Sequence, residues 1–332
     1  MKGLVTSGSR NIFTVSLEHD PARPPLECRI KGKILKDSEG FYNPLAPGDR
    51  VSIEAGPPRS GTGMILSLEK RRSVFTRFNQ KGGAPQILAA NVDIALLMTS
   101  PASPPFRPRF LDRALLQADA AGLEAFIVCN KYDLGADPDV EERLEDFIRI
   151  GYRVLRVSAK TRAGLSELRA LIDGKSSVLV GQSGTGKSSL INALLSASKF
   201  RVGAINEKYD RGNHTTTMAV MVELPPGRAG AEAGGFGAGE PGPGGRAGTT
   251  RLIDTPGIRR FVPDGIKPGD IIFHLREFAP LAGTCTYGLS CSHRTEPGCK
   301  IMEAVSAGVI HEDRYESFLR IRDELSGGKY AD

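Results

Sequence analysis

Residues 177–195 read SVLVGQSGTGKSSLINALL, and this stretch decides the fold of the chain. Its first four residues predict a short buried strand, and the run from Ser189 to Leu195 has the apolar 3.6-residue spacing of a helix. The residues between them fit G-x-x-x-x-G-K-[ST], in which backbone N–H groups wrap phosphates, Lys187 meets the β and γ phosphates and Ser188 ligates Mg²⁺. We therefore expect a nucleotide phosphate loop made by Gly181, Gln182, Ser183, Gly184, Thr185, Gly186, Lys187, Ser188 and Ser189.

A second phosphate-facing motif, Asp254-Thr255-Pro256-Gly257, follows the apolar pair Leu252-Ile253. A carboxylate at such a strand tip can reach Mg²⁺, and the Gly257 N–H would face the γ phosphate. Taken alone the tetrapeptide is a common turn sequence, but downstream of a phosphate loop it predicts a nucleotide-sensing turn. We expect Asp254 to serve the bound Mg²⁺ and Gly257 to act in catalysis.

Two upstream motifs predict guanine recognition. Asn130-Lys131-Tyr132-Asp133 follows an apolar strand that ends at Cys129, and Ser158-Ala159-Lys160 follows another that ends at Val157. The Asp133 carboxylate can accept hydrogen bonds from N1–H and the 2-amino group of guanine, donors that adenine lacks there, which discriminates against ATP. Asn130 and Lys131 are expected to brace the loop and cover the base, and the Ala159 N–H to meet the guanine O6. The predicted base-binding residues are Asn130, Lys131, Tyr132, Asp133, Ser158, Ala159 and Lys160.

The order of these motifs predicts a circularly permuted GTPase domain. In an ordinary GTPase the phosphate loop comes first and the guanine motifs last, whereas here the order is G4-G5-G1-G2-G3. From Val92 to Asp254 strands alternate with helices, which indicates a doubly wound α/β sheet with the nucleotide at its strand tips. We expect this domain to span 91–262. Its segment 225–248 holds 10 Gly and 4 Pro in 24 residues and is predicted to be a disordered loop.

The sequence does not single out one residue that would orient the attacking water. Many GTPases place a glutamine just after the D-x-x-G turn to orient water, but Ile258 stands there and can neither donate nor accept. Intrinsic turnover should therefore be slow. In the switch-like stretch 211–217, RGNHTTT, His214 is the candidate to orient water or stabilise charge, and Thr216, with Thr215 close behind, is the candidate Mg²⁺ ligand. The alternative is that His214 contacts RNA or merely packs.

Composition narrows the class of protein. The 332 residues suffice for two or three domains, and the 40% apolar content is that of a globular protein. No stretch approaches the roughly 20 apolar residues that span a bilayer, and the N-terminus lacks the apolar core of a signal peptide. We expect a cytoplasmic protein that contacts no membrane. The five cysteines, an odd number without secretory context, make a disulfide framework improbable.

The N-terminal residues 1–72 predict a small β-barrel, for which an OB-fold is the economical choice. Short strands are expected at 12–15, 26–30, 50–53 and 64–68, with turns at 7–9 and 47–49. Residues 1–80 carry 13 Lys+Arg against 8 Asp+Glu, which suggests a polyanion partner, although an ordinary solvated surface is the alternative. Because OB-fold barrels present basic and polar strand faces to RNA, we expect the barrel to bind RNA. A basic linker, 73–90, follows; its Phe75 and Phe78 either stack on bases or pack against the next domain.

A cysteine and histidine cluster marks the C-terminal region, 263–332. Cys285-x₅-Cys291-x-His293-x₅-Cys299 places three thiolates and one imidazole in 15 residues, a full tetrahedral ligand set for Zn²⁺. Because this set leaves no open position, we expect one structural zinc per chain; the alternative is reduced surface cysteines near a histidine. The residues from Lys300 to Leu325 predict one or two amphipathic helices, so the region should be a zinc-binding helical domain.

The chain resembles the RsgA family, the bacterial GTPases that depend on the small ribosomal subunit. The resemblance rests on four features together, which are the permuted motif order, the RGNHTTT stretch, the N-terminal barrel and the cysteine-histidine knuckle. The resemblance covers nearly the whole chain, and its main departure is the long Gly-rich insertion. It implies a factor that binds the maturing small subunit and its rRNA near the decoding region, with GTP hydrolysis to GDP stimulated by the subunit and coupled to release. A GTP-gated RNA-binding sensor with incidental hydrolysis is the alternative. A DNA regulator is a poor third, because one short knuckle reads little sequence. We expect a monomer.

Overall fold

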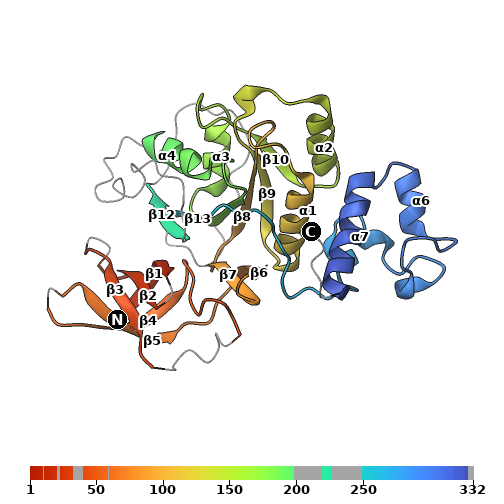
Figure 1. Cartoon of the computed structure of the whole chain (residues 1–332). Helices are drawn as coiled ribbons and strands as arrows, with labels where there is room; N and C mark the ends of the chain where they lie inside the picture. The colour runs from red at the N-terminus through yellow and green to blue at the C-terminus, as the bar shows by residue number, and fades with distance from the viewer. Residues whose placement is uncertain are drawn as a thin grey trace.

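The structure, a computed structural model, describes residues 1–9, 11–20, 23–32, 40–58, 60–197, 219–225 and 249–327. It has three parts along the chain: an N-terminal barrel, a central sheet with helices on both faces, and a C-terminal helical part beside helix α1 (Figure 1). No helix in the described ranges combines the length and the apolar character that crossing a bilayer requires. The expected three-part architecture is confirmed.

Five N-terminal strands close into a barrel. Strand β1 pairs with both β2 and β4, so the order β1-β2-β3-β5-β4 returns to its start. Alternate side chains point inward, and Val5, Val15 and Ile53 are buried in the barrel core. The closed five-stranded barrel agrees with the OB-fold expected for 1–72. Its strands are β1 (Lys2–Ser9), β2 (Ile12–Leu17), β3 (Leu26–Ile30), β4 (Arg50–Ala55) and β5 (Thr62–Leu68).

The turn expected at 7–9 is wrong, because β1 continues through these residues. Gly8 pairs with Phe13 of β2 across the antiparallel ladder. A Cβ built on Gly8 would lie 2.3 Å from Cδ1 of the Phe13 ring. The glycine therefore makes room for a cross-strand aromatic ring and does not mark a reversal of the chain.

The segment 73–90, expected as a linker, is a β-hairpin of β6 (Val74–Asn79) and β7 (Ala84–Ala90). Phe75 is fully buried, and its ring centroid lies 5.8 Å from that of Phe261. The backbone N–H of Phe78 donates to the carbonyl of Val262 at 2.9 Å. These contacts tie the hairpin to the central part of the molecule, so Phe75 packs and is not available to stack on bases.

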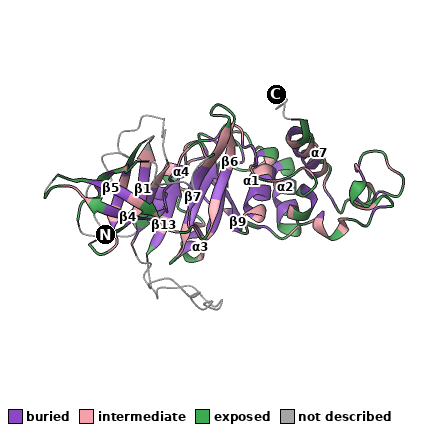
Figure 2. Cartoon of the chain, turned by 90° about the horizontal axis from the view of Figure 1, so that it is seen from below, coloured by how far each residue is buried: buried purple, intermediate pink, exposed green. Residues whose placement is uncertain are grey.

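The central sheet has the strand order β10-β9-β8-β11-β13-β12, with β12 alone antiparallel to its neighbour. Helices α1 and α2 pack on one face and α3 and α4 on the other, which is the doubly wound arrangement expected. Buried residues follow β13 and β9 through the middle of the molecule (Figure 2). The strands are β8 (Ile94–Thr99), β9 (Glu124–Cys129), β10 (Arg153–Arg156), β11 (Ser176–Gly181), β12 (Val220–Leu224) and β13 (Thr250–Asp254). The helices are α1 (Pro108–Ala120), α2 (Pro138–Arg149), α3 (Leu165–Ile172) and α4 (Lys187–Ala197), with a 3₁₀ turn η2 (Tyr132–Leu134).

The barrel and the central sheet are joined through their edges. Strand β1 pairs antiparallel with β12, with Ser7 opposite Val220, so that the barrel and the sheet form one 11-stranded system. Since β12 is an edge strand of the nucleotide-domain sheet, this pairing covers backbone groups that would otherwise be unpaired.

The C-terminal part packs its own small core against α1. Phe278 and Phe318 lie with ring centroids 4.9 Å apart, and Leu116 of α1 joins the same apolar cluster. Figure 1 shows α7 running beside α1, with α6 further out. The two helices α6 and α7 agree with the one or two expected after the cysteine cluster. The elements are η3 (Ile271–His274), η4 (Ala279–Leu281), η5 (Gly288–Ser290), α6 (Lys300–Ser306) and α7 (Glu312–Gly327).

A buried ion network fastens α7 to α1. The side chain of Arg314 is 1% exposed and donates to Asp112 Oδ1 at 2.9 Å and to the two oxygens of Glu277 at 2.6 and 2.9 Å. Arg113 of α1 pairs with Glu324 of α7 at 2.6 Å in the same interface. Removing one partner of such a network leaves charges buried without compensation.

We therefore expect Arg314→Ala to lower the free energy of unfolding of the C-terminal part by about 3–5 kcal/mol. Urea denaturation, with hydrogen exchange of α7 as the local readout, measures the loss. Arg320→Ala on the same helix is the matched control, since its pair with Glu316 is more than half exposed and should contribute about 0.5 kcal/mol or less. Equal losses in the two variants would show that burial of Arg314 is not what stabilises the interface.

Candidate functional site

The phosphate loop connects β11 to α4, as expected from its sequence. Gly184 and Gly186 adopt φ angles of +86° and +87°, which favour glycine. A Cβ on Gly186 would also lie 2.4 Å from Nδ2 of Asn130, so the close approach of the two loops requires the glycine. Lys187 is buried and its Nζ donates to the carbonyls of Gly181 and Gln182 at 3.0 and 3.1 Å. Burial lowers the pKa of Lys187 from its ordinary value.

Two of the residues expected to serve Mg²⁺, Ser188 and Asp254, lie together. The Ser188 hydroxyl donates to Asp254 Oδ2 at 3.0 Å, and Asp254 is 1% exposed. Its other oxygen, Oδ1, is buried and has no hydrogen-bond partner among the described residues. Burial raises the pKa of Asp254, with the charge of Lys187 opposing that shift. A hydroxyl and a desolvated carboxylate with a spare oxygen form a donor set that fits a hard divalent cation.

The turn after β13 contacts the phosphate loop directly. A Cβ on Gly257 would lie 2.7 Å from Cα of Ser183, so no larger residue fits there without moving the loop. The backbone N–H of Ile258 donates to the Gly181 carbonyl at 3.1 Å, while its side chain is buried in the apolar core. The position where many GTPases carry a glutamine therefore has an inward-facing aliphatic group.

The two guanine motifs and the phosphate loop are held together by one asparagine. Asn130 is buried; its Nδ2 donates to the Thr185 carbonyl at 2.9 Å, and its Oδ1 accepts from the Ala159 N–H at 3.0 Å. This bracing role agrees with the expectation for Asn130. The Ala159 N–H, expected to meet the base, donates to Asn130 in this structure.

Asp133 is exposed at the same edge of the sheet, and its Oδ1 accepts from the Ser158 hydroxyl at 2.6 Å. That bond orients the carboxylate, and its Oδ2 has no hydrogen-bond partner among the described residues. Lys131 has a φ of +64°, and its Nζ donates to the Ser103 carbonyl at 2.8 Å. Lys160 and Ser189 are exposed beside the site.

Arg156 was missed by the sequence reasoning. It lies on β10, two residues before Ser158, and donates to Glu141 and Glu145 of α2 at 2.9 and 2.6 Å. Its guanidinium also lies 5.8 Å from the ring centroid of Tyr132. One arginine thus supports both guanine loops from behind, through partners that no local sequence pattern connects.

Several expected residues cannot be placed. His214, Thr215 and Thr216, in the 211–217 stretch, lie outside the described residues. The same holds for 226–248, nearly all of the Gly- and Pro-rich segment.

The four expected metal ligands converge in the C-terminal part. The Sγ atoms of Cys285 and Cys299 lie 3.9 Å apart, and Nδ1 of His293 lies 3.6 and 3.4 Å from them. With Cys291, all four ligand atoms lie within 4.8 Å of one another, and all four residues are buried. Zn–S bonds of about 2.3 Å in a tetrahedron place sulfurs about 3.8 Å apart, so the arrangement fits a closed metal site.

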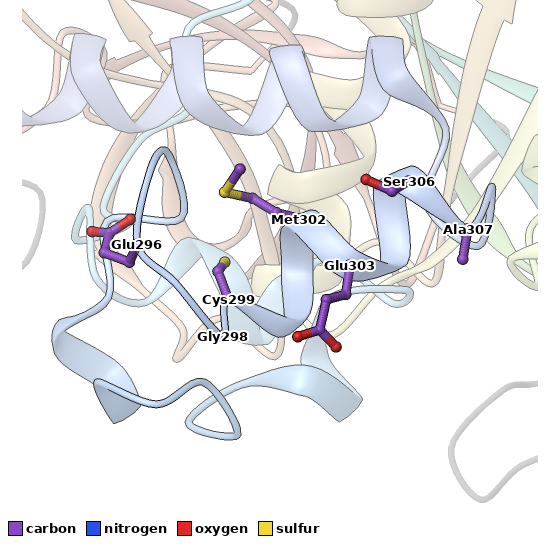
Figure 3. A pocket seen from close by; sticks show the side chains of 7 residues that line it. All are labelled: Glu296, Gly298, Cys299, Met302, Glu303, Ser306 and Ala307. Carbon is purple, nitrogen blue, oxygen red and sulfur yellow. The ribbon is translucent and has the colours of Figure 1, made fainter.

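Neighbouring groups order the ligand loop. The Glu296 carboxylate accepts from the backbone N–H groups of Ser292, Arg294 and Thr295, and the bonds from Ser292 and Arg294 lower the pKa of Glu296. Figure 3 shows Cys299 directly before α6, between Glu296 and Met302. The Lys300 N–H donates to the Cys285 sulfur at 3.3 Å, a contact that favours a thiolate.

Comparisons with known proteins agree with this geometry. The profile of a family described as RsgA GTPase matches residues 68–239. A small ribosomal subunit biogenesis GTPase RsgA from Chlorobaculum parvum is 37% identical over 309 residues, covering 91% of this chain and 92% of the relative. One of the same name from Gemmatimonas aurantiaca is 36% identical over 98% of this chain and 97% of its own.

Two solved structures have the same fold. YjeQ from Thermotoga maritima superposes with a TM-score of 0.65 at 27% identity, covering 98% of both chains. YloQ, described as a circularly permuted GTPase, gives a TM-score of 0.63 at 21% identity over 100% of this chain and 96% of its own. These likenesses extend over the barrel, the central sheet and the C-terminal part together.

Proposed function

The chain belongs to the RsgA family of GTPases, and from that premise we propose that it hydrolyses GTP during late maturation of the small ribosomal subunit. In this proposal it binds the subunit in the GTP state and hydrolyses GTP to GDP and phosphate on stimulation by the subunit. The observation that carries the proposal is the convergence of the phosphate loop, Asp254 and both guanine motifs at one edge of the sheet. A monomer acting in the cytoplasm, without membrane or DNA partners, is the working form we propose.

We assign each group of residues in the site a role that its chemistry supports. Ser188 and Asp254, with Thr216 from the undescribed stretch, would hold Mg²⁺, which when bound neutralises charge on the β and γ phosphates. Lys187 and the loop amides bind the same phosphates, and Asp133 selects guanine. Cys285, Cys291, His293 and Cys299 would hold one zinc, which shapes the C-terminal part and takes no part in the reaction.

The barrel is the proposed RNA-contacting part. Three of its basic residues, Lys2, Lys31 and Arg50, form exposed ion pairs with glutamates, which leaves their positive ends at the surface. Exposed pairs of this kind are weak and can exchange their carboxylate for a phosphate.

The proposal is tested by GTP turnover with and without purified small and large ribosomal subunits. We expect slow intrinsic turnover, because Ile258 supplies no polar group, and a many-fold increase with small subunits alone. RNA binding that depends on GTP but brings no increase in turnover would favour the alternative, a GTP-gated RNA-binding sensor.

His214→Ala is expected to lower the subunit-stimulated kcat by roughly 10²-fold or more, the usual worth of a group that orients or activates water. GTP affinity and subunit binding are measured separately and should be preserved. A kcat that is unchanged, or that falls only in step with subunit binding, would assign His214 to RNA contact or packing instead.

A further inference from the structure

A cavity of 380 Å³ lies beside the phosphate loop and shares only Gln182 with the nucleotide-binding residues described above. It is bounded by the start of α1, the segment after Gly257 and the phosphate-loop residue Gln182. Five arginines line it, two from α1, one just before α1 and two from the segment after Gly257; they are Arg107, Arg109, Arg113, Arg259 and Arg260. So many guanidinium groups around one small cavity indicate an anion as its occupant.

Three of these arginines are already paired. Arg109 contacts Glu316 at 2.7 Å, and Arg113 and Arg260 share Glu324 at 2.6 and 3.4 Å. These pairs hold the guanidinium groups in place and offset part of their charge. The wall also carries Asp313, whose carboxylate lies 3.8 Å from Arg143.

Arg107 and Arg259 differ from the other three. Both are exposed, and neither forms an ion pair with any residue that the structure describes. They approach the cavity from two separate segments, the turn before α1 and the segment after Gly257. Two guanidinium groups that line one cavity from separate segments can bind the oxygens of a single tetrahedral oxyanion.

Gln182 is a second, independent sign of a ligand. It is 9% exposed and lines the cavity. Its backbone carbonyl accepts from Thr185 and Lys187, whereas its side-chain amide has no hydrogen-bond partner within the described ranges. Neither atom of the amide is fully removed from solvent, so the group is available to a ligand that replaces water in the cavity. Its N–H₂ group is a suitable donor for a phosphate oxygen.

We propose that this cavity binds a phosphate group, with Arg107, Arg259 and the Gln182 amide as its donors. The phosphate belongs either to a free phosphorylated molecule or to an RNA backbone. In either case it would connect α1, the phosphate loop and the segment after Gly257. That segment is bonded to the loop by the Ile258 N–H, so occupancy is expected to change GTP turnover.

The first arm of the test uses inorganic phosphate and the full chain. The protein is saturated with Mg²⁺ and a non-hydrolysable GTP analogue, so that the nucleotide phosphate positions are filled, and phosphate is titrated by calorimetry. A free source predicts saturable binding that Arg107→Gln and Arg259→Gln each weaken about tenfold. Arg153→Gln, an exposed arginine on the far edge strand β10, is the matched control and should bind as the parent chain does.

The second arm rests on the proposed function and uses small ribosomal subunits. Subunit affinity is measured against KCl concentration, and an RNA source predicts that each cavity variant lowers the log–log salt slope by about 1, with Arg153→Gln unchanged. Both variants should keep the basal GTP turnover. Arg107 contacts the start of α1 through its backbone carbonyl, which the substitution leaves in place, and Arg259 is not one of the predicted nucleotide-binding residues.

The outcomes are separable. Failure of the parent chain to bind subunits contradicts the proposed function and leaves the first arm to decide the cavity. Weaker phosphate binding in the variants supports the proposal with a free phosphorylated molecule as the ligand. A reduced salt slope in the variants supports it with an RNA backbone as the ligand. The proposal is overturned if the parent chain shows no saturable phosphate binding and both variants have the same salt slope as the parent chain. It is also overturned if the parent chain binds neither phosphate nor subunits.

Discussion

Chelation of zinc, or Cys291→Ser, is expected to unfold the ligand loop from Gly283 to about Ile301 while GTP affinity stays largely intact. A closed four-ligand site contributes folding free energy outright, about 10–16 kcal/mol of apparent binding in small zinc domains. The structure extends the expected damage to α7, because Tyr315 donates to the His293 carbonyl at 2.6 Å and Arg322 to that of Ser292 at 2.6 Å. Hydrogen exchange across the two segments and elemental analysis, with one zinc per chain expected, measure the effect.

The control for this experiment is Cys28→Ser. It makes the same chemical change at a buried cysteine of the barrel core, far from the cluster, and should leave the metal content unchanged. A preparation of the parent chain that is folded and active without zinc would contradict the assignment. Loss of GTP affinity in step with zinc would show instead that the C-terminal part supports the nucleotide site through α1.

Asp133→Asn is expected to weaken GTP binding by about 3 kcal/mol or more, roughly 10²-fold in Kd, and to gain affinity for xanthosine triphosphate. The geometry at Asp133 explains this change of preference from GTP to xanthosine triphosphate. Ser158 donates to Oδ1 at 2.6 Å, so an asparagine would turn its carbonyl oxygen toward Ser158 and present its N–H₂ group to the base. That group matches the 2-oxo acceptor of xanthine and opposes the 2-amino donor of guanine.

Nucleotide affinities for the two triphosphates, measured by displacement of a fluorescent analogue, give the ratio directly. Asp139→Asn is the matched control, an exposed aspartate six positions further along the chain at the start of α2. Unchanged GTP affinity in Asp133→Asn would remove Asp133 from base recognition.

The local motifs were predictable because each is a short run of residues whose chemistry depends on close neighbours in the chain. The phosphate loop needs small residues and a lysine between a strand and a helix, and 177–195 supplies all of these in order. The cysteine-histidine spacing likewise brought Cys285, Cys291, His293 and Cys299 within 4.8 Å. Patterns of this kind are informative because the backbone between the ligands is too short to place them far apart.

The errors arose where a residue serves a distant partner. Gly8 indicated a turn, yet it lies in β1 to admit the ring of Phe13. The segment 73–90 looked like a basic linker, yet Phe75 inserts into the core beside Phe261, which lies far along the chain. Neither contact can be predicted from the composition of the neighbouring residues in the chain.

By itself, the sequence determined the motif order, the candidate guanine-binding residues, the candidate metal ligands and the class of each part, since these depend on residue type and short spacing. Only the tertiary structure decided how the parts meet. Closure of the barrel by β1 with β4, the pairing of β1 with β12 and the burial of Arg314 between α1 and α7 all join residues far apart in the chain. The arginine cavity beside Gln182 is of the same kind, because its wall forms only when the start of α1 and the segment after Gly257 fold against the phosphate loop. Such long-range contacts are set by the packing of whole elements, a property that no local run of residues carries.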